Sequence, residues 1–262
     1  MADILEEIIA YKRKEVERYK QELAQDVLES RIDIGSNDHR VMMKEVLATS
    51  QTGIIAEFKR KSPSKGWINK EADPGIIAPS YQQNGASALS ILADTRFFGG
   101  SVQHIRCARA RKVTIPILCK NFIIDDYQVY QAKLFGATAI LLIASCLEKA
   151  ECKRLIDKAH ELKLEVLLEM HSEEETEYAD LGPDMCGINN RNLGTFDTDV
   201  QNSFQLVGRL PSDAVKVSES GISDPQTVKQ LRDAGFRGFL IGENFMSAPD
   251  PGQALASFIS RL

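Results

Sequence analysis

Eight apolar segments of strand length, separated by segments with helical periodicity, constrain the fold of this chain most strongly. Most of them are apolar almost throughout rather than alternating, which is typical of strands buried on both faces of a parallel sheet. Eight strands that alternate with helices over about 210 residues predict an α/β fold, a (β/α)8 TIM barrel. The eight segments are residues 53–59, 88–93, 116–120, 139–144, 165–170, 185–189, 215–220 and 238–242.

The alternative fold is an open, doubly wound sheet, and two features argue against it. Such a sheet usually has fewer strands and a glycine-rich first turn, whereas this chain has no GxGxxG motif. A weak repeat also favours the barrel, because a glycine stands shortly before every second strand, as a helix C-cap would. These glycines are Gly85, Gly136, Gly182 and Gly235.

The first fifty residues lie outside the eightfold pattern. We expect a single barrel domain over residues 1–262, in which residues 1–50 form an N-terminal helical extension. Near its start, apolar residues follow one helical stripe and charged residues fill the remainder, so we expect a helix that packs on the barrel and closes one end. The stripe consists of Ile4, Leu5, Ile8, Ile9, Tyr11 and Val16.

Composition excludes several classes of partner. A net charge of −5 leaves no basic surplus to neutralise the phosphates of a nucleic acid, and no run of 18 apolar residues predicts a membrane-spanning helix. Five cysteines without a CxxC pair indicate reduced thiols and a cytoplasmic protein. The four histidines, at 39, 104, 160 and 171, show no metal-ligand spacing, and we expect surface or half-buried roles for them.

Charged residues stand at the ends of the odd-numbered strands. Glu57 and Lys59 end the first, Lys120 the third, Glu169 the fifth and Glu219 the seventh. In a barrel, alternate strands contribute side chains to the same interior layer, and active sites form at the carboxyl ends of the strands. We therefore expect these five groups to meet at the mouth of the barrel.

Each of these charged residues alone could have a purely structural role, because a Lys or Glu that ends a strand is commonly a solvated edge residue. Five ionisable groups at equivalent ends of four alternate strands are harder to explain in this way. A purely structural cluster of ion pairs would cost desolvation and add little stability. Function is the better interpretation.

Glycine-bearing turns after the last two strands predict a phosphate site. Ser220 and Gly221 follow the seventh strand, and Gly242 and Glu243 follow the eighth. Loops at these positions of a barrel often bind phosphate through backbone N–H groups, and glycine lets the backbone approach closely. We assign the contact of Glu243 to its backbone N–H and expect Ser62 to close over the phosphate from the other side. Each glycine alone is also explained as an ordinary turn residue.

The end of the sixth strand carries two further polar groups. Asn189 and Arg191 supply an amide and a guanidinium, which suit the hydroxyls and carboxylates of a ligand. For Arg191, a binding role and a plain surface charge are about equally supported.

With these residues in place, the chain closely resembles the indole-3-glycerol-phosphate synthase family, a barrel enzyme of the tryptophan pathway. The resemblance spans almost the whole chain, and its motifs occur in the order and spacing of the family. They are IIAEFKRKSPSKG from Ile54, ILCKNFIIDDYQ from Ile117, GINNRNL from Gly187, SESGI from Ser218 and LIGENFM from Leu240.

The resemblance implies a carboxy-lyase that closes the indole ring of 1-(2-carboxyphenylamino)-1-deoxyribulose 5-phosphate. The product is indole-3-glycerol phosphate, with release of CO2 and water, by general acid/base catalysis and without cofactor or metal. It also implies a phosphorylated small molecule as the substrate. We expect a monomer, with at most weak association with other enzymes of the tryptophan pathway.

The resemblance also assigns roles to residues. Lys120 matches the general acid of ring closure, and Lys59 matches the lysine that contacts the substrate's carboxylate and serves as a later acid. Glu57 and Glu169 match acid/base carboxylates, but the residues leave open which one takes the last proton and which lysine acts in dehydration. Asn189 and Glu219 match residues that bind substrate hydroxyls and organise the site. Arg191 matches the arginine beside the anthranilate end of the substrate, and Phe98 and Phe122 would flank the aromatic ring. The positions that match phosphate contacts are Ser62, Ser220, Gly221, Gly242 and Glu243.

Two other functions compete with this interpretation. A phosphoribosyl sugar isomerase would also bind phosphate at the last two strands, but isomerisation at one carbon needs only one acid/base pair. A non-catalytic binding or regulatory barrel is the second rival, and the joint presence of Glu57, Lys59, Lys120 and Glu169 argues against it.

Overall fold

The computed structural model describes residues 4–32, 41–192 and 194–262, and in it eight parallel strands close into a barrel. Their order around the barrel is β1-β10-β9-β8-β7-β6-β5-β4, which confirms the predicted fold class and all eight strand segments. The strands are β1 (Ile54–Phe58), β4 (Ala88–Leu92), β5 (Ile117–Lys120), β6 (Ala139–Ile143), β7 (Glu165–Met170), β8 (Met185–Asn189), β9 (Val215–Glu219) and β10 (Gly238–Ile241). A short hairpin of β2 (Lys61–Ser62) and β3 (Gly66–Trp67) follows β1.

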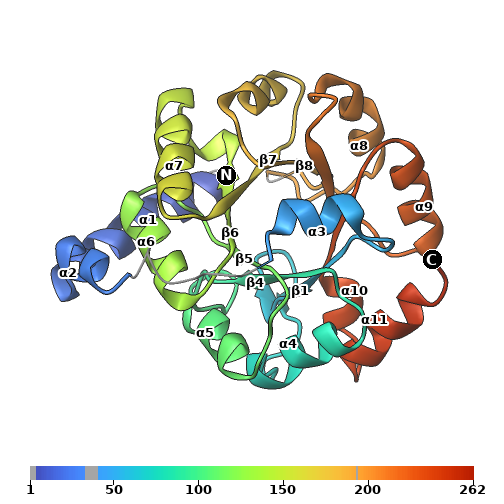
Figure 1. Cartoon of the computed structure of the whole chain (residues 1–262), viewed down its shortest axis with the longest axis horizontal. Coiled ribbons are helices and arrows are strands. Elements are labelled where there is room, and N and C mark those ends of the chain that lie inside the picture. The colour runs from blue at the N-terminus through green and yellow to red at the C-terminus, as the bar shows by residue number, and fades with distance from the viewer. Residues whose placement is uncertain (1–3, 33–40, 193) are drawn as a thin grey trace.

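Helices surround the barrel and connect its strands (Figure 1). The connection from β7 to β8 is a 3-10 helix, η2 (Glu174–Leu181), and two shorter 3-10 turns are η1 (Ala144–Cys146) and η3 (Val207–Arg209). The α-helices are α1 (Ile4–Glu22), α2 (Gln25–Ser30), α3 (Met43–Thr49), α4 (Pro74–Gln83), α5 (Gln103–Ala110), α6 (Asp126–Phe135), α7 (Lys149–Glu161), α8 (Gln201–Leu206), α9 (Pro225–Asp233), α10 (Glu243–Met246) and α11 (Pro251–Ile259). None of these described helices is long and apolar enough to cross a membrane.

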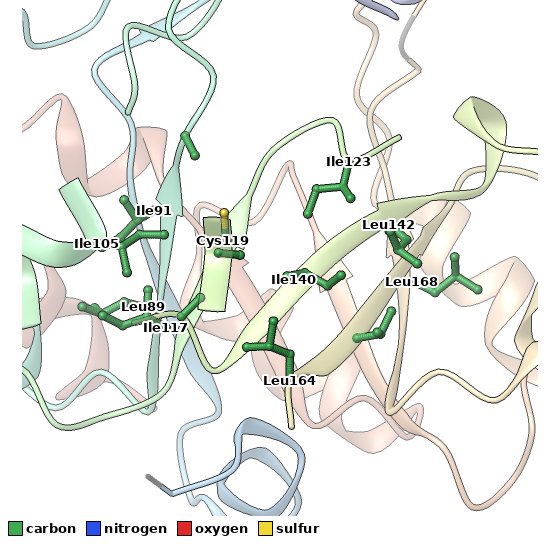
Figure 2. Packing of buried hydrophobic residues seen from close by; sticks show 14 of the residues in the cluster. Leu89, Ile91, Ile105, Ile117, Cys119, Ile123, Ile140, Leu142, Leu164 and Leu168 are labelled. Atoms are coloured by element: carbon green, nitrogen blue, oxygen red, sulfur yellow. The ribbon is translucent and has the colours of Figure 1, made fainter. Parts of the chain in front are cut away.

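Strand alternation divides the buried apolar residues into two clusters. One lies between the strands and the surrounding helices, where Leu89 and Ile91 of β4 pack near Ile105 of α5 (Figure 2). The other fills the barrel interior and includes Ile55 and Leu118. Side chains two positions further along these strands therefore point to the same axis at the mouth.

The predicted glycines before the even strands adopt the left-handed backbone that glycine favours. Their φ angles are 93° at Gly85, 96° at Gly136, 86° at Gly182 and 111° at Gly235. Gly136 and Gly182 are the C-cap residues of α6 and η2. These turns end one element and direct the chain into the next strand.

The N-terminal segment contributes helices to both ends of the barrel. Helix α3 lies across one end (Figure 1), where the backbone N–H groups of Met43 and Lys44 donate to the carboxylate of Glu165, the first residue of β7. Helix α1 lies at the other end, where Ile4 and Ile8 line a cavity. Residues 1–3 and 33–40 of the expected extension, His39 among them, lie outside the described residues.

The expectation that all charges of α1 lie outside its apolar stripe is wrong at two positions. Lys12 and Glu15 are buried beside Ile8 and Val16. The ammonium of Lys12 is 2.5 Å from Glu15 and 2.8 Å from Asp94, which follows β4. Mutual charge neutralisation makes the burial of these groups possible.

Candidate active site

A cavity of about 540 Å³ occupies the mouth of the barrel at the carboxyl ends of the strands. Thirteen of the fourteen residues predicted for the site line this cavity, and Glu219 is fully buried directly beneath it, in contact with Lys120. The thirteen are Glu57, Lys59, Ser62, Phe98, Lys120, Phe122, Glu169, Asn189, Arg191, Ser220, Gly221, Gly242 and Glu243.

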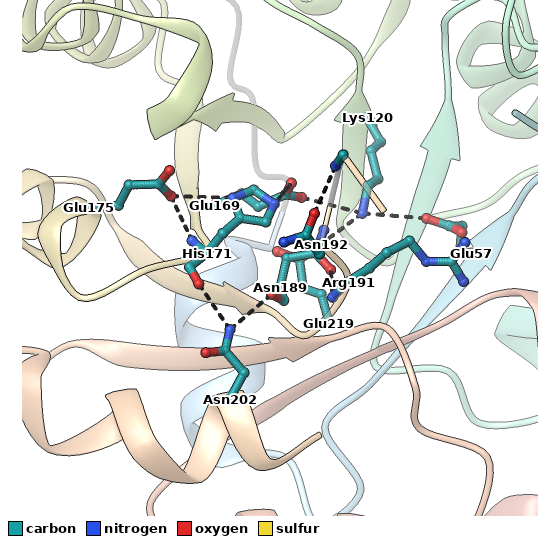
Figure 3. Close-up of polar contacts among 11 residues, drawn as sticks. Glu57, Lys120, Glu169, His171, Glu175, Asn189, Arg191, Asn192, Asn202 and Glu219 are labelled. Atoms are coloured by element: carbon teal, nitrogen blue, oxygen red, sulfur yellow. Dashed lines mark hydrogen bonds and ion pairs between the residues drawn. The ribbon is translucent and has the colours of Figure 1, made fainter. Parts of the chain in front are cut away.

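The ammonium of Lys120 lies among three carboxylates at the centre of the mouth (Figure 3). Its Nζ is 2.8 Å from Glu219, 3.6 Å from Glu57 and 3.8 Å from Glu169. A second lysine, Lys59, is 2.7 Å from the other oxygen of Glu57. Because β5 and β9 are four places apart in the ring of eight strands, the Lys120 side chain reaches across the barrel to Glu219.

This arrangement sets the protonation of the cluster. Burial alone would lower the pKa of Lys120, but the charges of Glu219, Glu57 and Glu169 outweigh it and raise that pKa. Burial would raise the pKa of Glu57, but Lys59 and Lys120 bring it below its usual range. For Glu219, burial together with the charge of Glu169 outweighs the attraction of Lys120 and raises the pKa to about 7. The cluster thus holds a protonated ammonium beside a carboxyl group that titrates near neutral pH.

Two glycines make room for these carboxylates. A Cβ on Gly187 of β8 would lie 2.5 Å from Oε1 of Glu219, and one on Gly242 would lie 3.0 Å from the Cβ of Glu57. Gly242 has a φ of −123°, which other residues also adopt. Gly242 is therefore explained by the space that Glu57 needs as well as by a close approach to phosphate.

Two buried oxygens in the cluster have no hydrogen-bond partner among the described residues. They are Oε2 of Glu169 and Oε1 of Glu219. Buried polar atoms in native proteins are nearly always satisfied, and the exceptions are common where a ligand binds. This part of the mouth is therefore suited to receive the polar groups of a substrate.

The loops after β9 and β10 form one side of the cavity. Ser220 and Gly221 both have left-handed backbones, with φ angles of 67° and 76°, and the Asn190 amide donates to the Ser220 carbonyl at 3.0 Å. A positive φ is uncommon for serine and indicates a turn held by its surroundings. From the facing hairpin, Lys65 forms an ion pair with Glu243, so this side carries a cation that sequence reasoning did not single out.

Aromatic side chains lie toward β4 and β5, across the mouth from β8 and β9. The ring centroids of Phe98 and Phe122 are 6.0 Å apart. Arg191, which follows β8, donates to the Ser64 hydroxyl at 3.2 Å, and its backbone N–H donates to the Asn189 side chain at 3.0 Å. The cavity thus combines an aromatic side, a charged centre and a side of turns rich in backbone N–H groups.

A family model and named relatives of this chain belong to the same enzyme family that the sequence motifs indicate. The family model described as indole-3-glycerol phosphate synthase matches residues 5–258. A protein of that name from Bacteroides thetaiotaomicron is 59% identical over 262 residues, which cover 100% of both chains. The chain belongs to the indole-3-glycerol phosphate synthase family. This family is a carboxy-lyase of tryptophan biosynthesis that acts on a phosphorylated small molecule.

Other similarities fit this family membership. An indole-3-glycerol phosphate synthase from Polaromonas sp. is 44% identical over 261 residues, which cover 98% of each chain. Among solved structures, 3-hexulose-6-phosphate synthase from Salmonella typhimurium matches with a TM-score of 0.64 and 14% identity, over 80% of this chain and 98% of that one. At that identity the likeness concerns the barrel fold alone.

Besides Lys65, sequence reasoning on this synthase-family chain missed two further charged residues near the site. His171 lies 3.2 Å from Glu169, and Lys12 connects α1 to Asp94. Spacing offered a signal for both, because His171 is two positions after Glu169 and Lys12 stands midway between Ile8 and Val16. Over residues 4–32, 41–192 and 194–262, no group of three or more His, Cys, Asp or Glu residues is arranged to hold a metal ion.

Proposed function

We propose that this chain converts 1-(2-carboxyphenylamino)-1-deoxyribulose 5-phosphate into indole-3-glycerol phosphate, with the cluster around Lys120 as its catalytic centre. The observation that carries the proposal is the position of the Lys120 ammonium, within 4 Å of three buried carboxylates at the floor of the mouth. A substrate with an aromatic ring at one end and a phosphate at the other fits a cavity with an aromatic side and a side of glycine turns.

Lys120 acts in the first step, ring closure. The aromatic carbon that bears the carboxylate attacks the ribulose carbonyl carbon, and the carbonyl oxygen takes a proton from Lys120 to become a hydroxyl. The raised pKa of Lys120, which the carboxylates of Glu219, Glu57 and Glu169 maintain against burial, keeps this proton in place before the attack.

Lys59 and the aromatic side act on the carboxyphenyl group. Loss of CO2 restores the aromaticity that the attack interrupts, and the carboxylate needs a cation nearby until it leaves. Lys59 lines the cavity beside Glu57 and supplies that charge, and Arg191 adds a second cation at the anthranilate end. Phe98 and Phe122 flank the aromatic ring.

Dehydration completes the reaction and needs one acid and one base. The hydroxyl formed in ring closure leaves as water after it receives a proton from Lys59 or Lys120, and a carboxylate removes the proton that allows the last double bond to form. Glu57 and Glu169 are the two candidates from the family match. Glu219 joins them, because burial raises its pKa to about 7, where a carboxylate exchanges protons most effectively. Asn189 holds substrate hydroxyls.

The phosphate binds on the opposite side of the mouth from β5. The turns after β9 and β10 supply backbone N–H groups for the phosphate. These N–H groups belong to Ser220, Gly221, Gly242 and Glu243. Ser62 of the β2–β3 hairpin closes over it, and Lys65 adds a positive charge from the same hairpin.

A sugar-phosphate isomerase and a non-catalytic barrel remain the rival functions. One acid/base pair is enough for isomerisation, whereas this mouth holds two lysines and three carboxylates in contact. A binding subunit has no need for so many buried charges, which are costly to desolvate.

We also propose that the chain works as a monomer in the cytoplasm, with at most weak contact with other enzymes of its pathway. All five cysteines are free thiols, as in proteins of a reducing compartment. The exposed large hydrophobic residues of the described segments come from four separate places: Val27, Val41 with Met42, Trp67, and Ile76. Light scattering after size exclusion measures the mass of the particle, for which we expect about one chain of 29.1 kDa.

The decisive test of the function is direct mixing of purified protein with the carboxyphenylamino ribulotide. We expect indole fluorescence to appear together with one equivalent of CO2, and no turnover of a phosphoribosyl aminoaldose, the substrate class of the rival isomerase. Binding of the ribulotide without CO2 release would instead support the non-catalytic barrel.

A further inference from the structure

His171 lies directly after β7 and is enclosed between two carboxylates (Figure 3). Its Nε2 is 3.2 Å from Oε1 of Glu169, and its Nδ1 is 3.2 Å from Oε2 of Glu175. Only 13% of the side chain is exposed. His171 does not line the cavity itself, so it can affect the site only by its contact with Glu169, which does line the cavity.

The chemistry of imidazole decides what these contacts require. A neutral ring carries one N–H, and its other nitrogen presents a lone pair that repels a carboxylate. Only the imidazolium form presents an N–H to each side. Nδ1 is within hydrogen-bond distance of Glu175, whereas the contact of Nε2 with Glu169 has the distance of an ion pair without the geometry of a hydrogen bond. Two carboxylates next to opposite nitrogens therefore favour the cationic form of His171 electrostatically.

Two neighbouring elements hold the backbone of His171 in this place. Glu175 of η2 also accepts the backbone N–H of His171 at 2.6 Å. Asn202 of α8 donates to the carbonyls of His171 at 3.1 Å and Asn189 at 3.2 Å, and so ties the ends of β7 and β8 together. The backbone of His171 is thus held at the end of β7, with its ring between the two carboxylates.

We propose that His171 is a positioning residue, a permanent imidazolium that keeps Glu169 ionised and oriented toward Lys120 during ring closure. This inference rests on the proposed function. Glu169 then lies between two cations, because its Oε1 faces His171 and its Oε2 is 3.8 Å from Lys120. A carboxylate between two cations is a poor proton acceptor, so Glu169 acts as a fixed anion in ring closure and is not the base that takes the last proton.

The acid–base properties of the two residues agree with this geometry. Burial alone would lower the pKa of His171, but Glu169 and Glu175 outweigh it and raise that pKa to about 10. Burial alone would raise the pKa of Glu169, but His171 and Lys120 lower it to about 2. The other charged groups around this pair are Glu175 from η2, Lys120 from β5, Glu57 from β1 and Glu219 from β9.

The first test observes His171 in the free protein and does not depend on activity. In protein with 15N-labelled histidine, we expect both ring nitrogens of His171 to carry protons up to about pH 9, with a titration midpoint that Glu175→Gln lowers by more than one pH unit. His160, whose Nε2 lies 2.9 Å from Asp184 on the exposed surface, serves as the internal reference. Titration of wild-type His171 near the ordinary pH of about 6.5 would overturn the proposal.

The second test compares pH–rate profiles for ribulotide conversion. In His171→Gln we expect the acid limb of kcat to move up by at least one pH unit, because Glu169 loses the cation that keeps it ionised. His171→Lys restores a cation and should move the limb back toward wild type, and His160→Gln should leave it unchanged. An unshifted profile in folded His171→Gln would overturn the positioning role. A wild-type protein that leaves the ribulotide unchanged would contradict the proposed function instead, and the 15N titration would still decide whether His171 is a fixed imidazolium.

Discussion

The ammonium of Lys12 and the carboxylate of Asp94 form a fully buried ion pair of 2.8 Å that joins helix α1 to the loop after β4. The other oxygen of Asp94 accepts the backbone N–H groups of Phe97 at 2.7 Å and Phe98 at 3.3 Å. One carboxylate thus connects α1 with the backbone that carries Phe98 into the cavity. The N-terminal helix is built into the site rather than added to the barrel.

Replacement of Lys12 by Met should destabilise the protein, because it leaves Asp94 and Glu15 buried without their cation. Loss of one partner of a buried pair typically costs about 3–5 kcal/mol. We expect a loss of this size in urea denaturation, and a KM for the ribulotide that rises more than kcat falls, since Phe98 loses its support. The control is Lys153→Met, which removes an exposed ion pair with Asp157 on α7 and should change stability by less than about 1 kcal/mol. Equal stability of the two variants would show that the Lys12 pair adds nothing to the fold.

The barrel was predictable because its determinants are local in the sequence. Each strand is a short apolar run, and glycines such as Gly136 end the helices that precede the even strands. The site followed from one further rule, since alternation sets Lys120 on the interior face with Leu118 and Glu169 with Leu167. Parallel strands bring such ends together whatever their distance in the sequence.

Contacts between elements were not predictable in the same way. The burial of Lys12 depends on Asp94, which is 82 positions away and belongs to a different layer. Similarly, Gly242 follows the last strand as a phosphate-binding glycine would, and only the fold reveals that Glu57 fills the space in front of it. A pattern in one segment specifies which face a side chain occupies, but not which partner it meets there.

The turn at Gly221 provides a test of the phosphate site. A Cβ at this position would lie 2.8 Å from Cγ2 of Thr198, and the φ of 76° disfavours any side chain. We expect Gly221→Ala to raise KM at least tenfold with a smaller change in kcat. Gly208→Ala is the matched control, since nothing lies within 4 Å of the added methyl group. Inorganic phosphate should inhibit the wild type competitively, and inhibition that is independent of substrate concentration would argue against a phosphate site here.

The stability of the protein should depend on pH through His171. The folded state holds the His171 proton up to a pKa of about 10, whereas the unfolded chain releases it near 6.5. The contribution of this group is therefore complete below about pH 6.5 and is lost as the pH rises toward 10, at no more than about 1.4 kcal/mol per pH unit. The difference in unfolding free energy between wild type and His171→Gln should shrink over this window. A difference that is constant with pH would mean that His171 is neutral in the folded protein.

Single-turnover ring closure by Lys120→Met tests the central claim most directly. Met keeps most of the bulk of the side chain but removes the proton and the charge that face Glu219, Glu57 and Glu169. The matched control is Lys216→Met, since Lys216 is a half-buried lysine of β9 between the buried residues Val215 and Val217. We expect Lys120→Met to slow ring closure by at least about 10²-fold with little change in substrate affinity, and Lys216→Met to react at the wild-type rate. Ring closure at a near-normal rate in folded Lys120→Met would contradict the assignment of Lys120 as the acid.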